Sequence, residues 1–125
     1  MVGPRILTAE FMRHPDAGRR LAEAVVAMTA TGASKLDGFL IMIRSASSTR
    51  AAEIGREQIE ANHQRAVASE LGGDHAAERA ALILSMISGL QIMRQAIGLD
   101  ALNRPDPKLL ADLLGPLFQR LIREP

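Results

Sequence analysis

The sequence predicts an all-α protein: an antiparallel bundle of about five helices, whose last two helices pair with a second copy as a four-helix bundle. Ala, Leu, Met, Arg, Glu and Gln dominate the chain, and these residues favour helices. No run alternates between apolar and polar side chains as a half-buried strand does. A chain of 125 residues fits one domain over 1–125, in which we expect 1–14 to be loosely attached.

Charge and cysteine content exclude several classes of protein. The net charge is +1 and the basic residues are scattered, so the chain lacks the basic patch of a nucleic-acid binder. Without cysteine there is no disulfide framework and no thiol chemistry. The first apolar run is too short and too charged for a signal peptide, and we expect a cytoplasmic protein.

Helix-breaking residues divide the N-terminal part into two helical segments. The first, “ILTAEFMR” over 6–13, is short and is closed by His14 and Pro15. The second begins at Pro15 and Asp16, ends at Gly32, and carries apolar residues at helical spacing.

The middle of the chain predicts a buried helix followed by a long one. A helix over 34–47 has a wholly apolar centre, “FLIMI”, and should therefore be enclosed by its neighbours. The next helix, over 48–71, has Ser48 or Thr49 as its N-cap and ends at the paired glycines that follow it.

The stretch “AALILSMISGLQIMRQAIGL”, 80–99, is the most apolar part of the chain. It belongs to a helix that we expect to run from near Asp74 to Gly98. Its length suits a membrane span, but Arg94 within it would cost a few kcal/mol at bilayer depth. We therefore predict a buried helix of a soluble bundle and no membrane contact.

The last predicted helix covers 107–122. Asp106 is its expected cap, and Pro107 suits its first turn. Gly115 and Pro116 should bend this helix or open one of its backbone hydrogen bonds.

Both of the last two helices carry more apolar residues than one face can hold. A helix on the surface of a monomer needs only one apolar stripe. The chain has too few other helices to cover two faces, so we predict a homodimer around a two-fold axis. The alternative is a monomer whose single core takes up the excess. The predicted interface residues are Ile83, Ile87, Arg94, Leu110, Leu113, Leu114, Leu117 and Leu121.

The segments “AALILSMISGLQIMRQAIGLDAL” and “DPKLLADLLGPLFQRLI” resemble the last two helices of the regulatory domain of TetR/AcrR-type transcriptional repressors. Gly89, Arg94, Leu99 and Pro116 stand where that pattern has them. The stretch upstream of these segments is similar to the two preceding helices of the same domain.

This resemblance implies a domain that binds a small molecule and dimerises through its last two helices. In that family, ligand binding changes the spacing of two N-terminal DNA-reading domains, which is a shift between two arrangements. Residues 1–33 offer no basic recognition helix. We therefore expect DNA contact only through an N-terminal domain missing from this chain. The chain is then either a fragment or a natural gene product without a DNA-binding domain.

We expect a ligand site for an apolar small molecule in the body of each subunit, around the segment 34–47. Apolar walls with one or two polar groups are typical of such sites, and methionine adapts to varied apolar ligands. His63 lies on the inward stripe of its helix; the alternative role for it is a hydrogen-bonded core residue. The predicted lining residues are Met28, Phe39, Met42, Ile59, Asn62, His63, Met86 and Leu90.

No motif in the sequence indicates catalysis. There is no HExxH spacing, no GxSxG motif with a plausible base, and no phosphate-binding loop. We therefore predict no enzymatic activity, no cofactor and no metal. The second functional hypothesis is a helical dimerisation module without a ligand, which a ligand-dependent rise in melting temperature would separate from the first.

Overall fold

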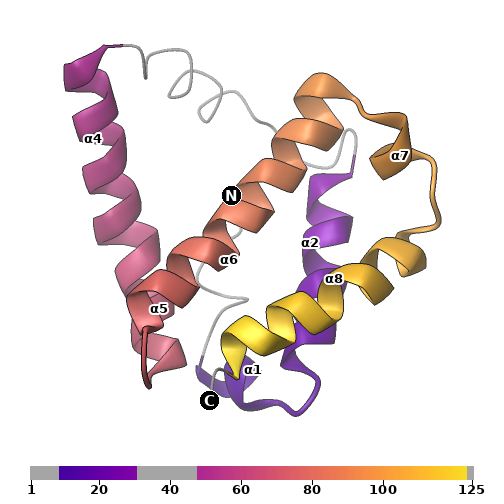
Figure 1. Cartoon of the computed structure of the whole chain (residues 1–125), viewed down its shortest axis with the longest axis horizontal. Coiled ribbons are helices and arrows are strands. Elements are labelled where there is room, and N and C mark those ends of the chain that lie inside the picture. Colours follow the sequence, from indigo (N-terminus) through magenta and orange to yellow (C-terminus); the bar gives the residue numbers. More distant parts are fainter. Residues whose placement is uncertain (1–8, 31–47, 124–125) are drawn as a thin grey trace.

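The computed structural model describes residues 9–30 and 48–123, and every regular element in these ranges is helical (Figure 1). This confirms the predicted all-α class. The predicted helix over 34–47 lies outside the described residues. The described elements are α1 (Ala9–Arg13), α2 (Ala17–Thr29), α4 (Thr49–Ile59), the π-helical turn η1 (Glu60–Gln64), α5 (Arg65–Leu71), α6 (Ala76–Gln91), the π-helical segment η2 (Ile92–Ile97), α7 (Asp100–Asn103) and α8 (Pro107–Ile122).

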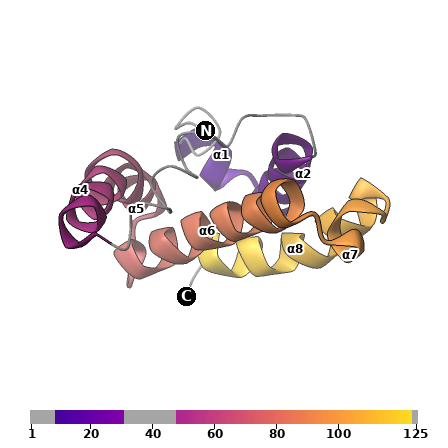
Figure 2. The same ribbon diagram turned by 90° about the horizontal axis from the view of Figure 1, so that it is seen from above.

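Helices α1, α2, α6 and α8 form two layers. Helices α6 and α8 lie side by side in one layer, and α1 and α2 lie behind them in the other (Figure 2). The beginning of α6 lies against the end of α8, because the Arg79 guanidinium donates to the carbonyls of Leu121 and Ile122 at 2.9 and 3.3 Å. These two helices are therefore antiparallel.

The core lies mainly between α2 and α8, which share the most extensive contact among the described elements. The glycine at position 18 permits this, since a Cβ there would overlap the backbone of Gln119. The Gly18 amide instead donates to the Gln119 Oε1 at 2.6 Å. Fully buried side chains then fill the space between the layers, including Leu21, Val25, Ile83 and Phe118.

The long helix predicted over 48–71 is present as one continuous helical run. Ser48 is its N-cap and accepts from the Ala51 amide at 3.4 Å, as the sequence indicated. The run is not uniform, because its middle turn, η1, has π-helical hydrogen bonding. Gly72 ends it with a φ of 63°, a backbone conformation that glycine adopts without a steric cost.

The helix predicted to end at Gly98 also finishes in a π-helical segment, η2. Gly98 has a φ of 76°, and its amide and that of Leu99 both donate to the Met93 carbonyl at 3.0 Å. The short helix α7 then occupies a link for which the sequence predicted no helix. Asp106 caps α8 by accepting from the Lys108 amide at 2.9 Å, as predicted.

Residues 9–14 of the segment expected to be loosely attached pack against the body. Met12 on α1 is buried in the core. The Arg123 guanidinium, just after α8, donates to the carbonyls of Arg13 and His14 at 2.7 and 2.5 Å. The two ends of the described chain are thereby joined.

Candidate functional site

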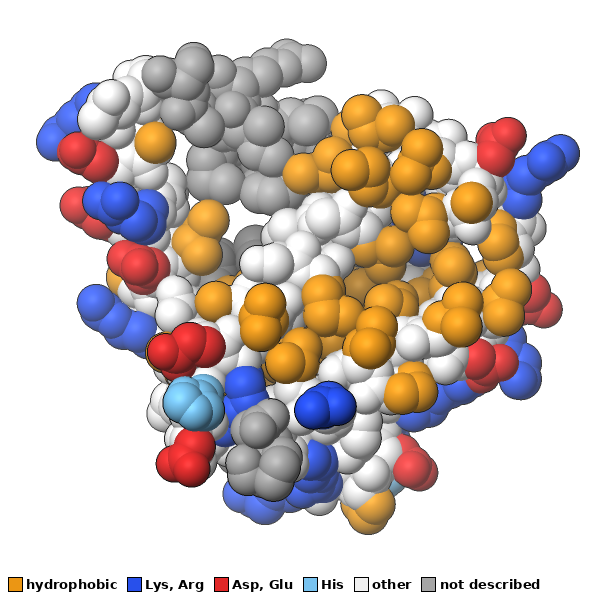
Figure 3. All heavy atoms as spheres, viewed as in Figure 1, with side chains coloured by type: hydrophobic (Ala, Val, Ile, Leu, Met, Phe, Trp, Pro, Cys, Tyr) orange, Lys and Arg blue, Asp and Glu red, His pale blue; other side chains and the backbone are white. Residues whose placement is uncertain are grey.

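The layer of α6 and α8 presents a broad apolar surface to the outside. Apolar side chains run across the centre and right of this face, and most charged side chains lie around its edges (Figure 3). Leu113 is 64 % exposed and Ile97 62 % exposed, which is unusual for large aliphatic side chains in a folded domain. We call this surface the α6–α8 face and define it by Leu82, Met93, Ile97, Leu99, Leu109, Leu113 and Leu117.

Helical spacing generates this face. Leu109, Leu113 and Leu117 are four residues apart and lie along one side of α8, whereas Ala111 and Phe118 on its other side are buried in the core. Helix α8 is therefore apolar on two sides, as the sequence predicted. Contiguous exposed apolar surface of this kind marks an interaction site.

The α6 part of the face contains a small residue where another helix could approach. Gly89 lies between Leu82 and Met93 at helical spacing. A Cβ added at Gly89 would meet no atom of the described residues within 4 Å, so no described element packs at this point. Small residues at helix crossings let two backbones come close together.

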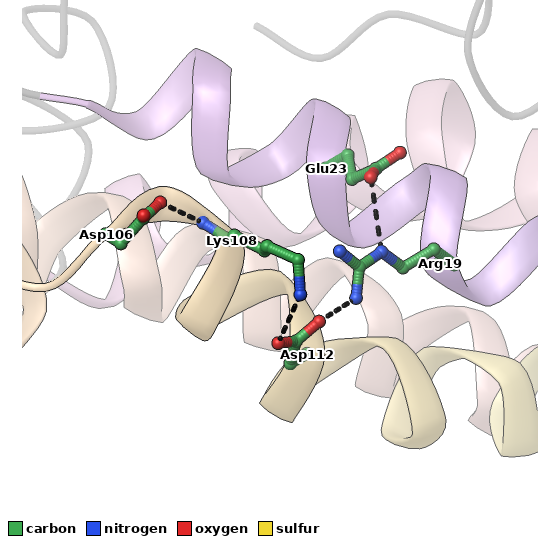
Figure 4. Close-up of polar contacts among 5 residues, drawn as sticks. All are labelled: Arg19, Glu23, Asp106, Lys108 and Asp112. Atoms are coloured by element: carbon green, nitrogen blue, oxygen red, sulfur yellow. Dashed lines mark hydrogen bonds and ion pairs between the residues drawn. The ribbon is translucent and has the colours of Figure 1, made fainter.

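Charged side chains link α2 to α8 (Figure 4). The Arg19 guanidinium bonds to the Asp112 carboxylate and, at 3.2 Å, to Glu23, while the Lys108 ammonium reaches Asp112 at 3.2 Å. The bonds to Asp112 and Glu23 raise the pKa of Arg19. The bonds from Arg19 and Lys108 lower the pKa of the Asp112 carboxyl. This network ties α2 to α8.

Two arginine side chains of the α6–η2 helix are buried. Arg79 is 4 % exposed and donates to the carbonyls of Leu121, Ile122, Asp74 and Gly72. Arg94 is 6 % exposed; its Nη1 donates to the Val26 carbonyl at 2.6 Å and to the Thr29 Oγ1 at 2.9 Å. Each guanidinium thus lies at the C-terminal end of another helix, where its positive charge complements the helix dipole.

Comparison with known protein families gives a match for this chain. The model of the family described as “Tetracyclin repressor-like, C-terminal domain” matches residues 16–122, which is most of the chain.

The chain belongs to the tetracyclin repressor-like C-terminal domain family.

No curated protein and no solved structure matched the chain significantly. Domains of the tetracyclin repressor-like C-terminal family are regulatory rather than catalytic, and they serve generally in dimerisation and small-molecule binding. Within the described residues, no group of three or more His, Asp or Glu side chains is placed to hold a metal ion.

In this tetracyclin repressor-like domain, the residues predicted for the dimer interface divide into two sets. Leu113 and Leu117 lie on the exposed α6–α8 face. The other six point into the subunit. Ile83, Ile87, Arg94 and Leu110 are buried within it, and Leu114 and Leu121 are half-buried against its core.

Four of the predicted ligand-lining residues have described side chains. Met28 at the end of α2 and Ile59 at the end of α4 are half-buried. Met86 and Leu90 on α6 pack against the core. Phe39, Met42 and the side chains of Asn62 and His63 lie outside the described residues.

Sequence reasoning missed part of the α6–α8 face. Leu82, Met93 and Ile97 are spaced at eleven and four residues and therefore share one side of the helix, next to the side that carries the buried Ile83 and Ile87. The signal was present in this spacing. Both sides of the helix are apolar, however, so the spacing alone does not say which one faces α2.

Proposed function

We propose that this domain senses an apolar small molecule and dimerises, as part of a TetR-type transcriptional regulator whose DNA-binding domain receives the signal. The observation that carries the proposal is the exposed α6–α8 face of a domain of the tetracyclin repressor-like family. We further propose that the regulator is a cytoplasmic repressor and that DNA is contacted only through the N-terminal domain.

The partner on the α6–α8 face is a second copy of this chain. Two antiparallel helices with an exposed apolar side meet the same pair from another subunit as a four-helix bundle. A two-fold axis brings the same surface together twice, so every apolar residue of the face finds an apolar counterpart. The half-buried Leu114 and Leu121 and the buried Ile83, Ile87 and Leu110 then support the interface from within each subunit.

The helix formed by α6 and η2 is long and apolar enough to span a membrane. By length and composition alone, Ala76–Ile97 passes that test. Arg79 and Arg94 lie within this range, and both are folded against carbonyl oxygens of the same subunit. These contacts favour a helix that packs in protein, and we propose no membrane contact.

The ligand site we propose lies in the body of the subunit, away from the dimer face. Met86 and Leu90 pack toward the core rather than outward. The residues Asn62 and His63 fall in the π-helical turn η1. Such turns occur frequently at functional sites, because they displace side chains from the regular helical register.

Substitution on the α6–α8 face tests the dimer. We expect the purified chain to be a dimer by light scattering and Leu113→Glu to be a folded monomer, because a charge at the centre of an apolar interface stays unpaired. Ile54→Glu is the matched control, since Ile54 is also an exposed aliphatic residue but lies on α4, outside the face. A monomeric wild-type chain would overturn the dimer proposal.

Ligand sensing is tested separately with a neutral apolar probe, methyl decanoate. We expect saturable binding by isothermal calorimetry and a rise in melting temperature with probe concentration. The exposed α6–α8 face also supports the second candidate, a dimerisation module without a ligand. A stable dimer that binds no probe would favour that candidate.

A further inference from the structure

Arg94 carries a buried positive charge for which the described residues supply no carboxylate. Its side chain is 6 % exposed, and none of the ion pairs among the described residues includes it. Burial lowers the pKa of Arg94, which shows the cost of removing this charge from water. The end of α2 compensates part of that cost through two hydrogen bonds, both from Nη1.

The opposite edge of the guanidinium has no partner among the described residues. The Nε atom is buried and makes no hydrogen bond, and Nη2 makes no bond to a described residue. Arg79, which is equally buried, uses Nε, Nη1 and Nη2 on carbonyl oxygens. An unsatisfied buried donor costs free energy, so the unpaired Nε of Arg94 requires a structural explanation.

Arg94 lies next to the proposed ligand site. Ile83, Ile87, Leu90 and Arg94 are spaced at four, three and four residues and so follow one side of the α6–η2 helix. Leu90 lines the proposed site, and Met28, another of its residues, is one position before Thr29, which binds Arg94. The Arg94 guanidinium thus follows three apolar residues, Ile83, Ile87 and Leu90, along the same side of the helix.

We propose that Arg94 is the counter-ion for the carboxylate of an apolar ligand. The Nε and Nη2 protons lie parallel on one edge and match the two oxygens of a carboxylate. A carboxylate there would satisfy the buried Nε and neutralise the charge at the same time. The inference rests on the proposed sensing function and specifies its ligand class as an apolar acid.

The test compares decanoate with its methyl ester, both below their aggregation limits, by isothermal calorimetry on the whole chain. The two probes share the alkyl chain and differ in the charge. We expect decanoate to bind at least about ten-fold more tightly, as a charge-assisted hydrogen bond typically provides. Arg94→Lys keeps the positive charge but loses the two parallel N–H donors of the guanidinium. Arg94→Met removes both the charge and the donors. Arg79→Lys is the control at an equally buried arginine.

In the Arg94 variants we expect the preference for the acid to fall to about three-fold or less while the ester binds as before. In Arg79→Lys the preference should persist. Carbon-13 spectra of carboxyl-labelled decanoate measure the pKa of the bound acid. We expect this pKa to be lower with wild-type protein than with Arg94→Lys. If Arg94 only stabilised the fold, the pKa of the bound acid would be the same in both.

Equal binding of acid and ester by the wild-type chain would overturn the carboxylate inference but leave ligand sensing intact. A preference that survives in folded Arg94→Lys, with an unchanged pKa of the bound acid, would also overturn it. Absence of binding by either probe would count against both the inference and the sensing function.

Discussion

Individual residues decide how closely the two central helices meet. Gly18 on α2 faces the backbone of Gln119 on α8, and a Cβ added at Gly115 on α8 would lie 3.5 Å from the Cα of Arg19. Gly89, by contrast, has no atom of the 9–30 and 48–123 ranges within 4 Å of the position where a Cβ would lie. The same residue type thus serves close packing at one position and an exposed surface at another.

Gly18→Ala should destabilise the domain by about 1–3 kcal/mol, because the added methyl group must push α8 away. The measurement is the free energy of unfolding in urea. Gly89→Ala is the internal comparison, and in a monomeric Leu113→Glu background it should stabilise by about 0.5–1 kcal/mol through helix propensity. Equal effects at the two positions would contradict the packing shown here.

Asp112 makes the stability depend on pH. Its folded pKa lies below the ordinary value of 3.8 because Arg19 and Lys108 bond to the carboxylate. The contribution to stability is therefore present above about pH 3.8 and is lost as the pH falls through the lower folded value. We expect Asp112→Asn to lower the melting temperature at pH 6 and the difference from wild type to shrink below pH 3.8.

The control for this titration is Glu57→Gln, since Glu57 is exposed on α4 and has no ion pair with a described residue. Its melting temperature should follow that of the wild-type chain across the whole pH range. A constant difference between Asp112→Asn and wild type at every pH would show that the carboxylate charge is not responsible.

At the scale of elements, arginines join helix ends that are distant in the sequence. Arg79 connects the start of α6 to the end of α8, Arg94 connects η2 to the end of α2, and Arg123 connects the end of α8 to α1. Each supplies donors to carbonyls that have no partner within their own helix. The exposed Arg123 bonds compete with water, whereas the buried ones do not.

Arg79→Met should therefore cost about 2–3 kcal/mol of unfolding free energy, since it leaves two carbonyl oxygens at the end of α8, and those of Gly72 and Asp74, without this donor. Arg123→Met should cost less than about 1 kcal/mol, because water replaces its bonds. Chemical denaturation of both variants measures the difference. A smaller loss for Arg79→Met than for Arg123→Met would refute this ranking.

At the scale of the whole molecule, the exposed α6–α8 face leads us to expect that folding is coupled to association. If the subunit dimerises through the α6–α8 face, the folded state is favoured by mass action. Each tenfold rise in protein concentration should then raise the melting temperature by about 3 °C. Leu113→Glu should show no such dependence, whereas Ile54→Glu should retain it. Scanning calorimetry over a hundredfold concentration range provides the measurement, and a melting temperature independent of concentration in the wild-type chain would argue for a monomer.

The sequence by itself determined the all-α class, most helix boundaries and the cap at Asp106, and it narrowed the cap of the helix over 48–71 to Ser48 or Thr49. These features depend on residues close together in the chain: a side chain that accepts from a nearby amide, a glycine that adopts positive φ, or a composition that favours helix. It also showed that α8 is apolar on two sides. The family likeness followed from the order of these local features.

Only the tertiary structure decided which apolar side of each helix faces the core. Leu110 and Leu113 are equally apolar, yet one is buried and the other 64 % exposed, because α2 covers one side of α8 and nothing in the described subunit covers the other. The sequence likewise predicted Arg94 as an interface residue. Only the position of α2 against its guanidinium shows that this side chain is buried. Helical spacing sorts residues into faces, but the free energy of burial that assigns a role to each face comes from residues far away in the chain.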